Sequence, residues 1–244
     1  YMQYASDVHT YHAFAQKVET FNNAHTRNLR MYVSCAMRQL DEHESRVMLS
    51  RVDSLTAVIS HTRDERQLAI ILQQRAVAES GAQNYDAAIT DLTACIGIDS
   101  TSVLALWQRA YCQSMMNEFD HSASSATAKQ DPALNAMRVI ADLDRAIQLD
   151  EDNQYLYYNR GCANFARKDY MHAIDDFTRA INIDANLAEA YYNRGLARVQ
   201  NGLKAEGIAD LSKAGELGLY NAYSVIKRVS ADNSKNETNN NKTK

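Results

Sequence analysis

The sequence predicts an all-α fold built from a repeated pair of helices. The triplet Gln-Arg-Ala occurs at Gln74–Ala76 and Gln108–Ala110, and Asn-Arg-Gly occurs at Asn159–Gly161 and Asn193–Gly195. The first two and the last two triplets are 34 residues apart, and the middle step is 51 residues, one period plus 17. A fixed period of this length indicates a helical repeat array. Only 1 Pro and 8 Gly occur in 244 residues, so long helices can run without interruption.

The overall composition narrows the classes of function. The 26 Lys and Arg against 30 Asp and Glu give a formal net charge of −4, and no basic run occurs, so a nucleic-acid partner is not expected. No apolar stretch approaches the roughly 18–20 residues that span a bilayer, so membrane insertion is not expected either. The 45% of hydrophobic residues is sufficient for a buried core.

Small side chains mark where the two helices of each repeat would pack. When Ala69, Val103, Gln154 and Ala188 are taken as position 1, small residues recur at positions 8, 20 and 27. Antiparallel helices approach closely only where side chains are short. The register predicts four repeats, 69–102, 103–153, 154–187 and 188–221, with first helices Ala69–Gly81, Val103–Met115, Gln154–Ala166 and Ala188–Gln200.

The repeats carry a recognisable order of large and small residues. The first repeat has Leu72, Ala76, Tyr85, Ala88, Leu92 and Cys95, and the third has Tyr157, Gly161, Tyr170, Ala173, Phe177 and Ala180. Residues 68–221 therefore resemble a tetratricopeptide-repeat (TPR) protein, which implies a right-handed α-solenoid of helix hairpins. The proline expected near position 32 is absent from every repeat, so the turns between repeats should be less rigid.

The second repeat contains the 17-residue insertion, at about residues 121–138. It is rich in Ser and Ala and holds the only proline, Pro132. We expect a loop near Lys129–Pro132 followed by a lengthened second helix, Ala133–Leu149. Insertions in arrays map to one face and often carry function, but a neutral, tolerated insertion is an equal alternative.

The segments outside the period are expected to cap the array. Within residues 1–67, apolar spacing predicts helices at Tyr4–Phe21 and Glu42–Ser60, and Arg27–Cys35 alternates as a short strand or extended segment would. Such a mostly helical cap would cover the first repeat, because terminal units need a partly polar outer face.

At the other end a capping helix is expected over Tyr220–Arg228, ending at about residue 230, with Tyr223 and Ile226 covering the last repeat. Residues 231–244 are rich in Asn and Lys and are predicted to be disordered. The segment Ala214–Gly218 resembles the end of long bacterial TPR proteins that are often exported, and this resemblance implies a periplasmic or exported location.

Arginine recurs at position 7 and aspartate at position 23 of the repeat. Because a planar guanidinium can engage a carboxylate through two bonds, we predict structural ion pairs between the two helices of each repeat. Arginines acting as anchors for a ligand carboxylate are the alternative, but this alternative leaves the matching aspartates unexplained. The predicted pairs are Arg75 with Asp91, Arg109 with Asp142, Arg160 with Asp176, and Arg194 with Asp210.

The resemblance also implies that the first helices line a concave groove, chiefly through positions 2, 5, 9 and 12. Aromatic rings and amides gather at these positions and at position 6, which suits an extended peptide. Packing of the rings between repeats or under the cap is the alternative. The candidate peptide-binding residues are Gln73, Trp107, Gln108, Tyr111, Tyr155, Tyr158, Asn159, Tyr192 and Asn193. Positions 5 and 9 carry no cation, so a clamp for a C-terminal carboxylate is not expected.

No pattern in the sequence indicates catalysis, a metal or a cofactor. His9 and His12, and the cluster Asp41–Glu44, lack a third ligand at a recognised spacing. The four cysteines, Cys35, Cys95, Cys112 and Cys162, form no C-x-x-C pair and are expected to be buried thiols. We therefore expect no enzyme.

Two hypotheses for function follow. The first is a non-catalytic scaffold that binds a peptide or protein segment of unknown identity in the groove. The second is a structural spacer or self-association segment of a larger bacterial protein, with the groove filled by the chain's own N-terminal region. An enzyme with a site within residues 1–66 is a third possibility, supported only by His9 and His12.

Overall fold

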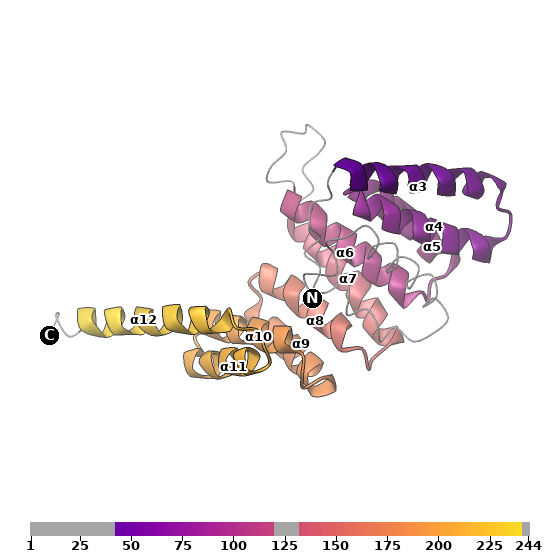
Figure 1. The fold of residues 1–244 in the computed structure, drawn as a ribbon. Helices are drawn as coiled ribbons and strands as arrows, with labels where there is room; N and C mark the ends of the chain where they lie inside the picture. Colours follow the sequence, from indigo (N-terminus) through magenta and orange to yellow (C-terminus); the bar gives the residue numbers. More distant parts are fainter. Residues whose placement is uncertain (1–41, 120–131, 241–244) are drawn as a thin grey trace. The chain divides into compact units, whose positions relative to one another are not determined.

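All of the secondary structure in the described residues, 42–119 and 132–240, is α-helical in the computed structural model (Figure 1). The chain divides into two compact units, one ending at Glu151 and one beginning at Asp152. The first contains α3 (Glu42–His61), α4 (Glu65–Gly81), α5 (Tyr85–Ile98), α6 (Val103–Phe119) and α7 (Pro132–Leu149). The second contains α8 (Gln154–Ala166), α9 (Tyr170–Ile183), α10 (Ala188–Gln200), α11 (Lys204–Glu216) and α12 (Ala222–Asn240).

Within each unit, consecutive helices pack as hairpins: α4 with α5, α6 with α7, α8 with α9 and α10 with α11. The predicted all-α class, with the stacked hairpins of an α-solenoid, is confirmed. The division of the chain into four repeats with separate caps stays a prediction. The first helices of the third and fourth hairpins have the predicted bounds.

The first two hairpins depart from the predicted helix bounds for local reasons. Helix α4 begins four residues before Ala69, because the Asp64 side chain accepts hydrogen bonds from the amides of Arg66 and Gln67 and so caps the helix there. Helix α6 continues to Phe119 instead of ending at Met115. The insertion removes the tight turn that ends the other first helices, and α7 begins at Pro132, close to the predicted start.

The helices of the fourth hairpin approach most closely at two glycines. A Cβ atom on Gly195 would lie 2.9 Å from the carbonyl oxygen of Gly207, and one on Gly207 would lie 2.7 Å from that of Gly195. In the third hairpin, a Cβ on Gly161 would lie 2.8 Å from the Phe177 ring. Positions 8 and 20 are therefore small because the facing helix occupies the space.

Side-chain hydrogen bonds hold the turns between hairpins in place of the missing proline. The Asp99 carboxylate accepts hydrogen bonds from the amide and the hydroxyl of Thr101, and Asp184 accepts one from the amide of Asn186. Arg145 donates to the carbonyl oxygen of Ser100, which stands where the proline was expected. These turns are consequently less free than the absence of proline suggested.

The helix at the N-terminal end of the described chain has nearly the predicted bounds, and the helix at the C-terminal end is longer than predicted. Helix α3 matches the predicted helix to within one residue, whereas Tyr4–Phe21 and Arg27–Cys35 lie outside the described residues. Helix α12 runs to Asn240, past the predicted limit near residue 230 and into the expected disordered tail. No Gly or Pro interrupts this segment, so a helix anchored at Ala222 can propagate.

The contacts of α12 also differ from those expected. Val225 and Val229 are buried against Leu211 and Ala214 and cover the end of the core. Ile226 is half-buried and packs against this core as predicted, whereas Tyr223 is 49% exposed and its ring lies over Gly215.

Three of the turns inside hairpins contain a residue with positive φ at position 15: Gln83 (φ 63°), Lys168 (φ 65°) and Gly202 (φ 88°). A non-glycine residue is strained in this conformation, since its Cβ crowds the backbone. Lys168→Gly should therefore raise the free energy of unfolding by up to about 1 kcal/mol. Arg167→Gly is the matched control, because Arg167 has right-handed helical geometry, and it should lower stability. Urea denaturation of both variants tests this, and destabilisation by Lys168→Gly would contradict it.

Candidate functional site

All four predicted arginine–aspartate pairs form. The distance from the arginine Nη2 to the aspartate Oδ1 is 2.6 Å for Arg75, Arg109 and Arg160 and 2.8 Å for Arg194. In each pair, Nε and Nη2 of the arginine both donate to the carboxylate. The four aspartates are buried, and the arginines are partly buried. Their partners are Asp91, Asp142, Asp176 and Asp210 in α5, α7, α9 and α11. The bond to Asp91 also raises the pKa of Arg75.

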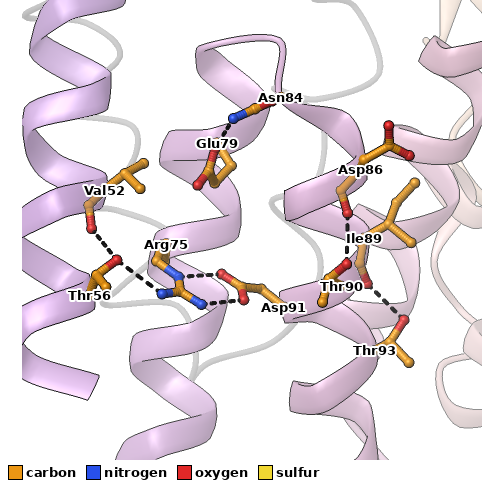
Figure 2. A network of polar contacts seen from close by, with 10 residues as sticks. All are labelled: Val52, Thr56, Arg75, Glu79, Asn84, Asp86, Ile89, Thr90, Asp91 and Thr93. Carbon is orange, nitrogen blue, oxygen red and sulfur yellow. Dashed lines mark hydrogen bonds and ion pairs between the residues drawn. The ribbon is translucent and has the colours of Figure 1, made fainter. Parts of the chain in front are cut away.

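Three of these arginines make a further contact that the sequence did not suggest. In Figure 2, Arg75 lies between Asp91 and Thr56, and its Nη1 donates to Thr56 Oγ1 at 3.0 Å. The threonine belongs to the helix that precedes the hairpin. Arg109 donates in the same way to Thr93, and Arg194 to Thr178, both at 3.1 Å. Each of these arginines thus joins its own hairpin to the preceding helix.

The threonines are oriented to accept these bonds. Each hydroxyl donates its own hydrogen to the carbonyl oxygen four residues earlier, on Val52, Ile89 or Ile174. The oxygen lone pairs then remain for the guanidinium. Thr93 and Thr178 each precede their arginine by 16 residues, which is a signal that sequence reasoning could have used, whereas Thr56 precedes Arg75 by 19.

Position 11 adds a second donor to the aspartate in the third and fourth hairpins. Asn164 donates to Asp176 at 3.0 Å, and Arg198 donates to Asp210 at 2.7 Å. A tyrosine ring at position 4 also lies over the arginine in both hairpins. The distance from the arginine Cζ to the ring centroid is 5.7 Å for Arg160 and Tyr157 and 5.4 Å for Arg194 and Tyr191. With their donors and faces engaged inside the protein, these arginines are poorly placed to bind a ligand carboxylate.

In the first compact unit, the candidate groove residues contact one another. Gln73 Nε2 donates to Gln108 Oε1 at 3.1 Å, which links α4 to α6, and the rings of Trp107 and Tyr111 stack at 6.0 Å. Gln73, Trp107 and Gln108 are buried, while Tyr111 is half-buried. The amides and rings predicted to flank a ligand therefore serve in part as packing between adjacent first helices.

The second compact unit repeats this arrangement with different side chains. Asn193 Nδ2 donates to Tyr158 Oη at 2.8 Å, which links α10 to α8 through the same positions, 6 and 5, as Gln108 and Gln73. Tyr158 also packs against Phe177, and Tyr155 is buried. Tyr192, Asn193 and Asn159 are half-buried, and the enclosed Nδ2 of Asn159 has no hydrogen-bond partner.

The described part of the chain therefore does not present the predicted aromatic residues as an exposed strip. Trp107, Tyr155 and Tyr158, which were to form much of it, are 2%, 3% and 7% exposed, because rings at positions 2 and 5 turn toward neighbouring helices. Periodicity identifies the face of a helix but not the depth to which neighbours cover it. The candidate residues that remain half-buried are Tyr111, Asn159, Tyr192 and Asn193.

The described cysteines do not have the character of nucleophiles. Burial raises the pKa of Cys95 to about 11, and that of Cys112 and of Cys162 to about 12. Thiols of this kind stay protonated at neutral pH. Within the described residues, no group of three or more His, Cys, Asp or Glu is placed to hold a metal ion. His9, His12 and the side chains of Asp41–Glu44 lie outside the described part of the chain.

None of the helices described combines the length and apolar character needed to cross a bilayer.

The removal of one threonine tests the contact between hairpins. Thr93→Val should lower the free energy of unfolding by about 1 kcal/mol, because Arg109 loses a hydrogen bond at Nη1. Thr90→Val is the matched control: Thr90 lies in the same helix and donates to the Asp86 carbonyl (Figure 2). Chemical denaturation compares the two variants, and equal losses would show that the arginine contact contributes nothing.

Comparison with known proteins shows a family-profile match within the second compact unit. A profile of the family described as TPR repeat matches residues 163–202, which include the end of α8 and the whole of α9 and α10. Among curated protein sequences, none matches the chain.

Solved structures of MamA have a similar fold. One MamA crystal structure is 20% identical and aligns with a TM-score of 0.59 over 75% of this chain and 98% of that one. A structure of MamA from residue 41 to its end, from Desulfovibrio magneticus RS-1, is 14% identical, with a TM-score of 0.56 over 74% and 97% of the two chains. At these identities the likeness concerns the fold. Together with the 34-residue period and the profile match over residues 163–202, it shows that the chain has the fold of a tetratricopeptide-repeat array.

Proposed function

We propose that the chain is a non-catalytic scaffold that binds extended protein segments on the first helices of the hairpins within each compact unit. The observation that supports the proposal is that structural contacts and accessible side chains occupy different positions on these helices. Position 7 is used for internal ion pairs, whereas Tyr111, Asn159, Tyr192 and Asn193 remain half-buried. Arrays of this type generally present a continuous surface to a partner.

The chemistry of these side chains suits a polypeptide. Tyrosine rings provide apolar contact area at a small entropic cost and keep a polar hydroxyl. Amides can both donate to and accept from a peptide backbone. The lack of Lys and Arg at positions 5 and 9 argues against recognition of a terminal carboxylate.

The half-buried tyrosines provide the test. A partner recovered from the source cell with the wild-type chain should bind Tyr111→Ala and Tyr192→Ala each about 5- to 30-fold more weakly, the usual effect of truncating an aromatic anchor. Tyr220→Ala is the control, because Tyr220 is 75% exposed and lies in the turn before α12. Calorimetric titration with the purified partner gives the affinities. Unchanged affinity in both variants would refute the assignment of this face.

Deletion of the N-terminal region distinguishes the proposal from the alternative, in which this region fills the groove. If residues 1–40 occupy the face, their removal should raise the affinity for the partner several-fold. If the face is open, deletion should leave the affinity unchanged. Light scattering on both proteins shows whether the chain self-associates.

A further inference from the structure

One charged residue stands out on the candidate binding face of the second compact unit. Positions 2, 5, 6, 9 and 12 of α8 and α10 form this face. Among them, Glu189 is the single charged residue. Asn159, Glu189, Tyr192 and Asn193 are half-buried on this face, whereas Tyr155 and Tyr158 are buried.

The Glu189 carboxylate is close to the polar centre of this face. Glu189 lies one helical turn before Asn193, whose Nδ2 donates to Tyr158 Oη at 2.8 Å, so the carboxylate and this hydrogen bond lie along the same side of α10. Burial raises the pKa of the Tyr158 hydroxyl well above its ordinary value, with smaller contributions in the same direction from Cys162 and Glu189. Tyr192 lies three residues after Glu189, so the two side chains share one side of α10. Glu189 is half-buried and is thus partly accessible.

No cation among the described residues neutralises this carboxylate. Arg160 pairs with Asp176, and Arg194 and Arg198 both pair with Asp210. A partly buried carboxylate beside aromatic rings is attractive to a cation, because ion pairing and the electron-rich ring faces act together.

A helix-stabilising role is the competing explanation for Glu189. It stands in the first turn of α10, where a carboxylate interacts favourably with the helix dipole, and the N-cap residue Leu187 contributes no side-chain bond. Glu206 occupies the first turn of α11 in the same way, but it is exposed and lies on a second helix of a hairpin. This residue provides a matched control for the dipole effect.

We infer that the protein segment bound by the second compact unit is cationic and places a Lys or Arg side chain between Glu189 and Tyr192. The inference rests on the proposed function and specifies the partner: a basic extended segment. An acidic segment would meet an unneutralised carboxylate and no positive charge on this face.

Blocked peptide pools test the inference on the full chain. Each pool of acetylated and amidated peptides has one fixed residue, Arg, Glu or norleucine, with the other positions mixed from Ala, Ser, Gly, Leu and Tyr. Fluorescence anisotropy should show the Arg pool binding at least about tenfold more tightly than the Glu pool. Glu189→Gln should reduce the preference for Arg over norleucine about fivefold, and Glu206→Gln should leave it unchanged.

The outcomes separate this inference from the proposed function. If Tyr192→Ala weakens all pools but Glu189→Gln keeps the preference for Arg, the face binds peptides and the cationic inference is wrong. Preference for the Glu pool would overturn the inference as well. If no pool binds, or Tyr192→Ala changes nothing, both the inference and the proposed function of this face fail. Circular dichroism of each variant establishes that the helices are intact.

Discussion

The arginine at position 7 is the interaction on which the rest of the architecture depends. Its planar fork fixes the second helix of its hairpin through two bonds to an aspartate, and in three cases its remaining nitrogen reaches a threonine on the preceding helix. A side chain with five donors in one plane can make these contacts at once, which lysine could not. One residue type therefore sets both the pairing within a hairpin and the stacking between neighbours.

This arrangement separates the groups that build the array from those available to a partner. The ion pairs and the glycines at Gly195 and Gly207 bring the helices into register, so the residues at positions 2, 5, 6 and 9 fall side by side on the first helices. Hydrogen bonds such as Gln73 to Gln108 and Asn193 to Tyr158 then order this face from one helix to the next. The buried residues of this face thus belong to the framework, whereas the half-buried Tyr111 and Tyr192 are partly accessible to a ligand.

The features that could be predicted from sequence are those that repeat. The bounds of α8 and α10 and the pairs at Arg160 and Arg194 follow from the period, because both partners recur with it. Thr56 was missed because its spacing to Arg75 departs from the period, and the early start of α4 depends on one capping side chain, Asp64. The burial of Trp107, Tyr155 and Tyr158 could not be predicted, since it depends on how deeply neighbouring side chains cover a face.

A double-mutant cycle on Arg109 and Asp142 tests the central claim most directly. These two residues lie in one compact unit and form a bidentate pair whose partners are largely buried. Arg109→Leu and Asp142→Leu should each lower the free energy of unfolding by about 3 kcal/mol, because each leaves a charge buried without its partner. The double variant should cost at least about 2 kcal/mol less than the sum of the two, measured by chemical denaturation. Additive losses, with a coupling below about 0.5 kcal/mol, would contradict the claim that this arginine organises the array.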